Sequence, residues 1–340
     1  MKIAIIVKHP IAQLAKYTTS HLAVEALRRG HSVSFVHSND LILADDGKVE
    51  AAIYPLESYN INTTNDLQNA LRSTEITTRL TSLNEYDVIL LRYNPTEWSP
   101  RADGNSMLEV MEFARRLQRS GVFVLSNPDS LRLCGSKLYL LEFPPHIRPR
   151  TFIARAPGPI KDFIRKLKRP AVIKPLNGYG GINTFFIAQD NTVNLNQMIE
   201  SITNVDYCVV QEFIDEDGVG EKRLLLLDGK PISINNRVAI YTRVRTDNND
   251  IRHNILVGAQ PHACSFTSSD ARIVDVLRPR LEADGVFLAG IDILGNKVLE
   301  INAFCTGGIN NINNLYGINV GEYVIVEMEK KVEARRQNHG

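Results

Sequence analysis

Three oxygen-bearing side chains stand in an otherwise apolar stretch of the chain. They are Asp292, Glu300 and Asn302, in the segment GIDILGNKVLEINAF. Carboxylates in apolar strands are costly unless they are paired or bind a cation. Glu300 and Asn302 are two residues apart, so on a strand both point to the same face. Such hard oxygen donors suit Mg²⁺ carrying the phosphates of a nucleotide, and the alternative is a pair of buried carboxylates satisfied by a nearby arginine.

The turn between these two strands decides whether Asp292 can share a face with Glu300. A two-residue loop at 295–296 would place Asp292 across from Leu299, and the two carboxylates would then point to opposite faces. A shared metal site therefore predicts an odd-numbered loop, most simply 295–297, that places Asp292 across from Glu300. Glycine and asparagine can adopt the positive φ of such a bulged turn.

A glycine-rich loop follows a predicted buried strand in the segment VIKPLNGYGG. Lys174 ends the strand, and glycines at 178, 180 and 181 leave bare amides that can approach phosphate oxygens. A plain turn is the alternative. The segment fits neither G-x-G-x-x-G nor the P-loop pattern, which argues against a dinucleotide dehydrogenase and a Walker-type NTPase. The first predicted βα turn, VKHPIAQLAKYTTSH, also lacks glycine.

An apolar strand that opens into an acidic turn forms a third candidate, CVVQEFI followed by DEDGVGEKRLLLL. Val210 and Phe213 could hold a flat adenine, while backbone groups of Glu212 and Ile214 pair with its edge. Glu221 would then take the ribose hydroxyls. Each feature alone is compatible with ordinary core, so the prediction rests on their order along the chain.

The composition favours small-molecule partners. The 340 residues carry 39 Lys and Arg against 38 Asp and Glu, a formal net charge of +1. This balance gives no electrostatic reason to bind nucleic acid or an anionic membrane. The four cysteines show no zinc or redox spacing, which predicts reduced thiols. Without a signal-peptide core or a run of about 20 apolar residues, we expect a cytoplasmic protein that does not enter the membrane.

Alternating strands and helices are expected to position these residues. Strands at 3–7, 32–36, 86–93 and 121–126, with helices at 20–29 and 106–119, predict a parallel sheet covered on both faces. Further along we expect helices at 130–142, 160–167, 195–202 and 316–332, the last followed by a polar tail, and strands at 170–176 and 207–214. Asp228-Gly229 between apolar runs predicts a hairpin.

Taken in order, these motifs resemble the ATP-grasp superfamily and, within it, bacterial glutathione synthetase. VIKPLNGYGG resembles the family's K-P-L-x-G-x-G-G loop, GEKRLLLLDGKPI its G-[DE]-K-R strand, and GIDILGNKVLEIN its L-D-I-I-G-x-x-x-x-E-I-N strand. Further segments that follow the family's order over nearly the whole chain are KIAIIVKHPIA, VILLRYNP, SNPDSLRLCGSKLYL and IRHNILVGA.

The resemblance implies an α/β fold of the ATP-grasp type. An N-terminal parallel-sheet domain (1–130) would precede two α+β subdomains that enclose the nucleotide. These are a central subdomain with the glycine-rich lid (131–205) and a C-terminal subdomain with hinge and metal strands (206–335), followed by a tail (336–340).

The resemblance also implies roles for particular residues. Those expected to bind ATP are Lys137, Lys174, the lid residues Gly178, Tyr179, Gly180 and Gly181, the hinge residues Gln211, Glu212, Phe213 and Ile214, and Glu221. Those expected to face the reacting carboxylate and its acyl phosphate are Arg223, Arg237, Arg252 and Asn254. Asp292, Glu300 and Asn302 would hold two Mg²⁺ ions, or Mn²⁺. For Arg243 and Arg245 we expect only solvation at the surface or ion pairing.

The implied reaction is ATP-dependent joining of a small carboxylic acid, such as an amino acid or short peptide, to an amine through an acyl phosphate. Two departures from the family predict an altered substrate: VGAQPHA replaces a G-G-R-G segment, and Phe304 follows the metal strand. The alternatives are a true glutathione synthetase joining γ-glutamylcysteine and glycine, and a catalytically silent nucleotide-binding protein. The family also suggests a homo-oligomer.

Overall fold

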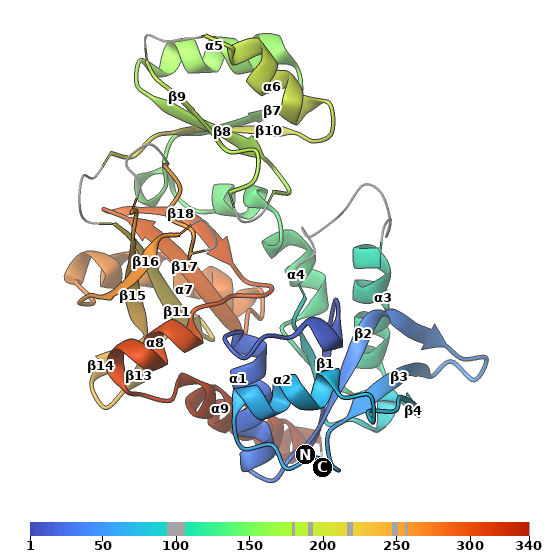
Figure 1. Cartoon of the computed structure of the whole chain (residues 1–340). Helices are drawn as coiled ribbons and strands as arrows, with labels where there is room; N and C mark the ends of the chain where they lie inside the picture. Colours follow the sequence, from blue (N-terminus) through green and yellow to red (C-terminus); the bar gives the residue numbers. More distant parts are fainter. Residues whose placement is uncertain are drawn as a thin grey trace.

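The computed structural model describes residues 1–93, 106–178, 181–189, 193–215, 220–246, 251–255 and 258–339. Its strands form three larger sheets and one short two-stranded hairpin. Figure 1 shows a central sheet at the top, a C-terminal sheet in the middle and an N-terminal sheet at the lower right. No helix in the described ranges is long and apolar enough to span a bilayer.

The N-terminal sheet has the strand order β4-β3-β2-β1-β5-β6. Pairing is parallel between β1 and β2, β1 and β5, and β5 and β6, as the alternation of apolar runs and helices predicted. The antiparallel pairs β2–β3 and β3–β4 were not predicted. The strands are β1 (Lys2–Val7), β2 (Ser32–Leu43), β3 (Val49–Pro55), β4 (Arg79–Ser82), β5 (Val88–Leu91) and β6 (Phe123–Leu125), with helices α1 (Thr18–Arg28), α2 (Thr64–Arg72), α3 (Ser106–Arg119) and α4 (Pro128–Cys134).

The central sheet is antiparallel, with the order β7-β10-β8-β9. Its strands are β7 (Thr151–Ala154), β8 (Ala171–Pro175), β9 (Phe185–Ile187) and β10 (Cys208–Glu212), and its helices are α5 (Pro157–Leu167) and α6 (Leu195–Thr203). Both helices cover the sheet face that points away from the rest of the molecule (Figure 1). Strand β10 pairs here, although the boundary predicted at 205/206 would place it in the C-terminal subdomain.

The C-terminal sheet has the order β16-β15-β11-β17-β18, with β12 paired to β11. Its strands are β11 (Glu221–Leu227), β12 (Lys230–Pro231), β15 (Ile240–Val244), β16 (Gln260–Ala263), β17 (Leu288–Leu294) and β18 (Lys297–Asn302), and β13 (Ser233–Ile234) and β14 (Arg237–Val238) form the separate hairpin. The predicted turn between β11 and β12 is confirmed, because Leu227 pairs with Lys230 and both Asp228 and Gly229 have positive φ, as a type I′ turn requires.

The β17–β18 hairpin reaches the predicted alignment by an unpredicted route. Leu294 pairs with Lys297, so the loop holds two residues and the predicted three-residue loop is wrong. The register then shifts, and Asp292 pairs with Glu300 as predicted. Leu299 is the extra residue of a β-bulge, and one extra residue reverses the parity of every later side chain. The bulge therefore achieves what we expected of the loop.

Two predicted helices are interrupted. The helix expected at 130–142 ends at Cys134, because Ser136 is extended and its side chain caps a separate 3₁₀ turn at Lys137–Glu142. The helix expected at 316–332 is two helices, α8 (Ile309–Tyr316) and α9 (Val320–His339), divided at Gly317 in the left-handed conformation. Because α9 continues to His339, residues 336–339 belong to a helix and not to a tail.

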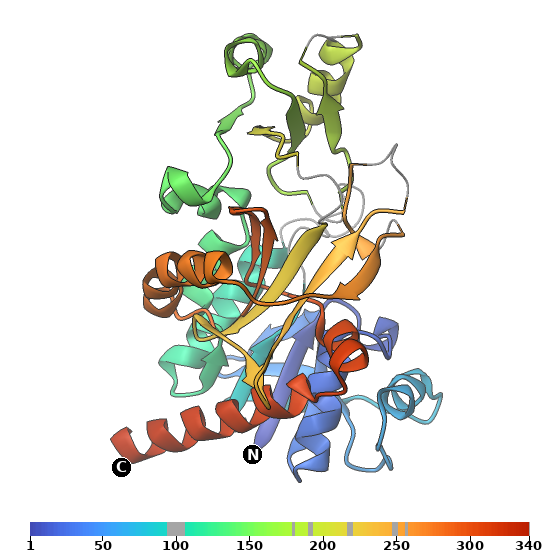
Figure 2. The same ribbon diagram turned by 90° about the vertical axis from the view of Figure 1, so that its left-hand side faces the viewer.

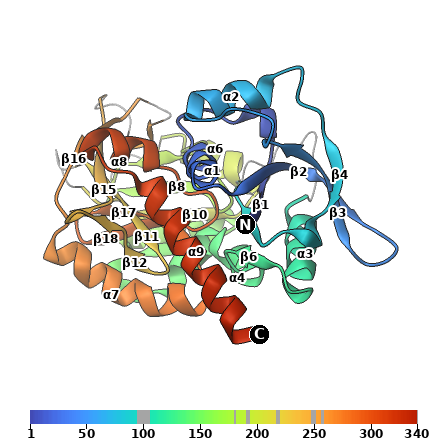
Figure 3. The ribbon, with the colours of Figure 1, turned by 90° about the horizontal axis from the view of Figure 1, so that it is seen from below.

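Two apolar cores join the N-terminal and C-terminal sheets, and a third belongs to the central sheet alone. Helix α7 (Ser268–Ala283) packs on one face of the C-terminal sheet, against Leu224 and Leu226. The opposite face packs Leu225 and Leu227 against α8 and α9, in a cluster that also contains residues of β1 and α1. Figures 2 and 3 show α9 lying across the base of both sheets. The central sheet and its helices form their own cluster.

Candidate functional site

A cavity lies between the central sheet and the C-terminal sheet. The central subdomain contributes residues of β8, β10 and the glycine loop, and the C-terminal subdomain contributes β11, β17, β18 and the segment 251–254. The predicted site residues among its lining are Lys137, Lys174, Gly178, Gly181, Gln211, Glu212, Phe213, Ile214, Glu221, Arg252, Asn254, Asp292 and Glu300. Residues far apart in the sequence thus meet around one space, as the motifs predicted.

Two lysines bring positive charge to this cavity. Lys174 lies on β8, and its Nζ is 3.2 Å from Gln211 Oε1 on the neighbouring strand. Lys137 begins the 3₁₀ turn, where its Nζ donates to the carbonyl oxygens of Leu176 and Gly178 and lies 3.8 Å from a Glu300 oxygen. Burial lowers the pKa of Lys137, although the Glu300 carboxylate opposes this effect. A desolvated ammonium next to free space is suited to an anionic ligand.

The predicted adenine hinge lies at the end of β10. The amides of Glu212 and Phe213 donate to the carbonyl oxygens of Arg150 and Pro170, whereas the Ile214 amide has no hydrogen-bond partner in the described part of the chain. That amide is available to a ligand. The role predicted for Val210 is wrong, because neighbouring strand residues alternate and Val210 points into the central core while Gln211 faces the cavity.

Segment 251–254 lies against the glycine loop. A Cβ on Gly181 would lie 2.6 Å from Arg252 Cδ and 2.8 Å from Asn254 Nδ2, and the φ of Gly181 is +76°. Only glycine allows this approach of the loop to both side chains. Tyr179 and Gly180, also predicted to bind ATP, lie outside the described residues.

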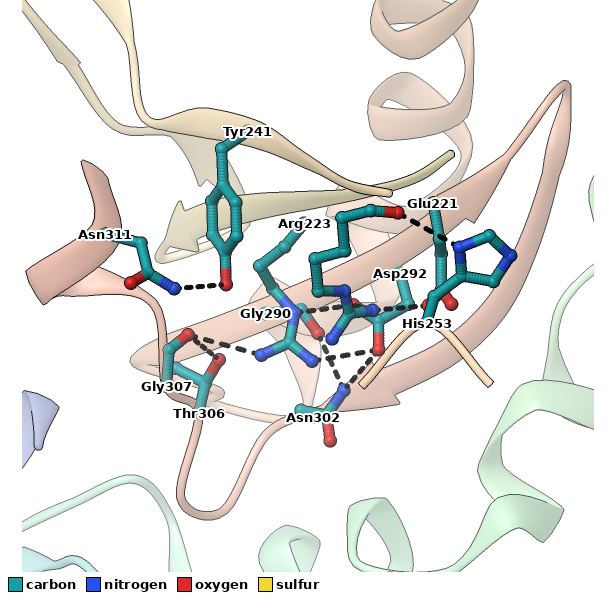
Figure 4. Close-up of polar contacts among 11 residues, drawn as sticks. Glu221, Arg223, Tyr241, His253, Gly290, Asp292, Asn302, Thr306, Gly307 and Asn311 are labelled. Carbon is teal, nitrogen blue, oxygen red and sulfur yellow. Dashed lines mark hydrogen bonds and ion pairs between the residues drawn. The ribbon is translucent and has the colours of Figure 1, made fainter. Parts of the chain in front are cut away.

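A buried network of four charges lies below the cavity, and Asp292 is at its centre (Figure 4). Arg223 binds Asp292 in a bidentate manner, with N–O distances of 2.5 and 2.9 Å. Arg243 Nη2 is 2.9 Å from Asp292 Oδ1 and also pairs with Glu221. Asn302 Nδ2 is 3.2 Å from Asp292 Oδ2. Each Asp292 oxygen therefore accepts two contacts.

The charges in this network shift one another's pKa values. Burial raises the pKa of Glu221 to about 7, against the opposing charge of Arg243. The pKa of Asp292 is lowered, because the two guanidinium groups outweigh the effect of its burial. Arg243 Nε is buried without a hydrogen-bond partner among the described residues. The network is therefore not fully satisfied by the protein.

Two predictions about arginines are corrected by the fold. Arg237 lies on β14, in the separate hairpin, and does not line the cavity. Arg243, for which we expected no site role, is only 4% exposed and binds both Glu221 and Asp292. Ion pairing was correctly predicted for Arg243, but we did not expect the pair to lie in the buried network of the site. Arg237 therefore stands outside the site, whereas β15 places Arg243 in the network around Asp292.

The metal prediction can be tested against the donor atoms. Glu300 has a side chain that is 38% exposed, with an ionic contact only to Lys137 in the described chain, so its oxygens are open to a cation. Asp292 already accepts four contacts, and the amide nitrogen of Asn302 points towards it. No group of three or more His, Cys, Asp or Glu side chains in the described ranges could hold a metal alone. Mg²⁺ typically takes one or two carboxylates together with substrate phosphates, so the set fits that ion.

His253 is a cavity residue that the sequence analysis missed. It lines the cavity between Arg252 and Asn254, and its Nδ1 is 3.0 Å from the carbonyl oxygen of Arg243. From the segment IRHNILVGA, the sequence analysis selected only Arg252 and Asn254 as site residues. A histidine between two predicted site residues was the signal available.

Residues 1–132 match the family model "Prokaryotic glutathione synthetase, N-terminal domain", and residues 136–317 match "Prokaryotic glutathione synthetase, ATP-grasp domain". The glutathione synthetase of Vibrio cholerae is 28% identical over 97% of this chain and 98% of its own length. That of Buchnera aphidicola from Acyrthosiphon pisum is 30% identical over 94% and 93%.

Two solved structures share the fold. The D-cycloserine synthetase DcsG has a TM-score of 0.65 at 13% identity and covers 97% of this chain and 99% of its own. The ATP-grasp ligase PsnB, complexed with minimal precursor, Mg and ADP, has a TM-score of 0.59 at 14% identity, with 97% and 98% covered.

Proposed function

This chain belongs to the prokaryotic glutathione synthetase family, and from that premise we propose how its residues join a carboxylic acid to an amine. Members of this family are ATP-dependent, ADP-forming C–N ligases of the ATP-grasp fold, which use a divalent metal. One observation carries the assignment of residues. The two lysines, Arg252 and Glu300 converge from four segments on the cavity beside the predicted hinge.

In the proposed first step, a substrate carboxylate attacks the γ-phosphate of ATP and gives an acyl phosphate and ADP. Phosphoryl transfer requires mainly positioning and neutralisation of charge. Lys137 and Lys174 neutralise the phosphate oxygens, and the open Ile214 amide holds the adenine edge. Gly181, packed against Arg252 and Asn254, closes the glycine loop over the phosphates and excludes water, which would hydrolyse an acyl phosphate.

In the proposed second step, an amine displaces the phosphate from the acyl phosphate. Arg223 and Arg243 lie below the cavity floor and supply positive charge where an oxyanion develops. Asp292 fixes both guanidinium groups in place, so their geometry is set before substrate enters.

We propose that Glu300, with Asp292 and Asn302, provides the oxygen donors for Mg²⁺. The ion would neutralise phosphate charge on the nucleotide. Glu300 is the most accessible of the three, because Asp292 is held by two arginines. The number of ions, and any use of Mn²⁺, belong to this proposal as well.

We further propose that the substrates differ from γ-glutamylcysteine and glycine. The departing segment VGAQPHA includes β16, where Pro261 pairs with Arg243 in a regular ladder. Phe304 is buried and packs edge-to-face on Tyr93, with ring centroids 5.4 Å apart.

A second candidate function is glutathione synthesis itself. It is favoured by the glutathione synthetase relatives, which align over nearly the whole length of both chains. The substrates are then those of the named relatives. The two candidates share one reaction and differ only in the acid and the amine.

A substrate panel separates these candidates. Phosphate release from ATP is measured with γ-glutamyl and amino-acid carboxylates, each paired with a series of amines. We expect γ-glutamylcysteine with glycine to be a poor pair. Efficient glutathione formation, with kcat/KM near about 10⁴ M⁻¹s⁻¹ or above, would instead establish the second candidate. The absence of ADP formation with every pair would contradict the proposed reaction.

A further inference from the structure

His253 offers a proton acceptor that the reaction needs. An amine arrives largely as an ammonium ion at neutral pH, and its nitrogen cannot attack the acyl phosphate until one proton leaves. The inference rests on the proposed function, because only amide formation requires this step. The question is which cavity side chain can accept the proton.

The other titratable groups that line the cavity are engaged in ion pairs or hydrogen bonds, or cannot accept a proton. Lys137 donates to two carbonyl oxygens, Lys174 lies against Gln211 Oε1, and the Arg252 guanidinium has no acceptor nitrogen. Glu212 lies 3.2 Å from Arg169. Glu221 has a pKa that burial raises to about 7, but it pairs with Arg243, so a proton taken from the amine would break that ion pair. Asp292 is held by two guanidinium groups, and Glu300 lies beside Lys137. Among the lining residues that the structure describes, His253 is the remaining base.

The hydrogen bond of His253 fixes its tautomer. Its Nδ1 lies 3.0 Å from the Arg243 carbonyl oxygen, which can only accept, so Nδ1 carries the proton. In the neutral ring Nε2 is then an unprotonated acceptor. Figure 4 shows the His253 ring with one nitrogen in a polar contact and the other without one among the residues drawn. Nε2 has no hydrogen-bond partner within the described ranges, and the residue lines the cavity.

The surroundings keep the imidazole neutral. Burial lowers its pKa, and the positive charges of Arg243 and Arg245 act in the same direction. The bond to the Arg243 carbonyl and the negative charge of Asp292 oppose the shift without reversing it. Arg252 is the adjacent cation in the same segment. A neutral imidazole near pH 7 is the form that can accept a proton.

We propose that His253 is the general base for the amine. Its Nε2 takes one proton from the substrate ammonium, and the freed nitrogen lone pair attacks the carbonyl carbon of the acyl phosphate. The C–N bond forms and the C–O bond to phosphate breaks. The second nitrogen proton leaves with the phosphate as HPO₄²⁻. The imidazolium then releases its proton to solvent.

The test compares two nucleophiles in one variant. His253→Asn places an amide N–H where Nδ1 donates to Arg243 and removes the Nε2 acceptor. The acid is the panel member giving the fastest phosphate release, and the nucleophiles are its preferred amino acid and hydroxylamine. Hydroxylamine is mostly unprotonated at neutral pH, so it needs no base. The control is His146→Asn, an exposed residue of the 3₁₀ turn Pro145–Ile147 that does not line the cavity.

We expect His253→Asn to lower kcat/KM for the amino acid about 10²-fold or more, the usual effect of losing a general base. Hydroxamate formation should stay near the wild-type rate, and the fall in wild-type amide formation at acidic pH should disappear. Equal loss with both nucleophiles, or no loss with either, would overturn the role of His253. A wild-type protein that forms neither product would overturn the proposed function as well.

Discussion

At the scale of single residues, the two predicted metal carboxylates have different environments. Asp292 is 2% exposed and binds Arg223 and Arg243, whereas the Glu300 side chain is 38% exposed beside Lys137. Removing the charge of a buried ion-pair partner leaves uncompensated charge, which typically costs about 3–5 kcal/mol. A partly exposed carboxylate has no such structural role. The two positions therefore separate metal binding from stability.

We predict that Glu300→Gln loses ADP formation while its unfolding free energy stays near that of the wild type. Asp292→Asn should lose both activity and stability, because two buried guanidinium groups lose their carboxylate. Urea unfolding and ADP release at saturating Mg²⁺ measure the two effects. Direct binding of Mn²⁺ to nucleotide-loaded protein gives a readout independent of turnover. Near-normal ADP formation by both variants would show that the metal assignment is wrong.

Glu221 predicts a pH dependence of stability. Its folded-state pKa of about 7 lies above the ordinary value of 4.5 because the side chain is buried. The native state therefore holds this proton more tightly than the unfolded chain does. The stabilisation is fully present below pH 4.5 and is lost as the pH rises through 7.

Glu221→Gln should flatten this part of the profile. The difference in unfolding free energy between pH 5 and pH 8, measured in urea, should shrink relative to the wild type. Glu282→Gln, on the exposed side of α7, should leave the difference unchanged. An equal pH dependence in wild type and Glu221→Gln would mean that Glu221 stays ionised across this range.

At the scale of elements, strands β11, β17 and β18 bring the charged side chains around Asp292 together. Gly290 on β17 allows the loop at Thr306 and Gly307 to pack against these strands. Gly290 lies on β17 across from Asn302. A Cβ at Gly290 would lie 2.0 Å from Thr306 Oγ1 and 3.0 Å from Arg223 Cδ. The loop at Thr306 and Gly307 accepts a 3.2 Å hydrogen bond from Arg223 Nη1 at the Gly307 carbonyl. The strand, the arginine and the loop therefore fit only around a glycine.

We predict that Gly290→Ala displaces Arg223 and the Thr306 loop, lowering both kcat and stability. Overpacking of this kind typically costs about 1–3 kcal/mol. Gly307→Ala is the matched control, since a Cβ there meets nothing within 4 Å. Steady-state kinetics and thermal unfolding of both variants make the comparison. Equal behaviour of the two alanines would contradict the close packing at Gly290.

At the scale of the whole molecule, one buried arginine joins the N-terminal sheet to the catalytic region. Arg92 directly follows β5, is 6% exposed, and donates to Thr19 Oγ1 at 3.3 Å and to the Thr306 carbonyl at 2.9 Å. Gly307, which follows Thr306, accepts a hydrogen bond from Arg223 at its carbonyl oxygen. The docking of the first sheet thus positions the loop that holds Arg223. The cavity proposed to bind ATP lies between the other two sheets.

We predict that Arg92→Met lowers kcat with little change in ATP affinity. Losing the guanidinium leaves a buried carbonyl and hydroxyl without donors, which typically costs about 1–3 kcal/mol of stability. ATP affinity by calorimetry, kcat and urea unfolding measure the three effects, and Arg92→Lys should recover part of kcat. Arg28→Met, at the exposed C-terminal end of α1, is the control. Loss of stability with unchanged kcat would show a purely structural role.

The sequence alone determined the family and its reaction, and it predicted most of the residues that the fold brings to one cavity. Lys174, the glycine loop, the hinge residues and the Asp292–Glu300 pair could be identified because each is local: a residue type beside a strand end, a glycine or a turn. The strands that carry them follow from apolar runs, and periodicity is likewise a local property. The motif order then pointed to the family that the comparisons confirm.

Only the tertiary structure decided how distant residues combine. The bulge at Leu299 aligns Asp292 with Glu300, since register depends on the paired strand and not on the turn sequence alone. Arg237 lies in the hairpin at 233–238, away from the cavity, whereas β15 places Arg243 in the charged network below it. The contacts of Arg243 with Glu221 and Asp292, and the single hydrogen bond that fixes the His253 tautomer, join different strands and segments. These charges interact strongly only when folding buries them within a few ångströms of one another. The low dielectric of the interior then strengthens each electrostatic interaction and shifts the pKa values.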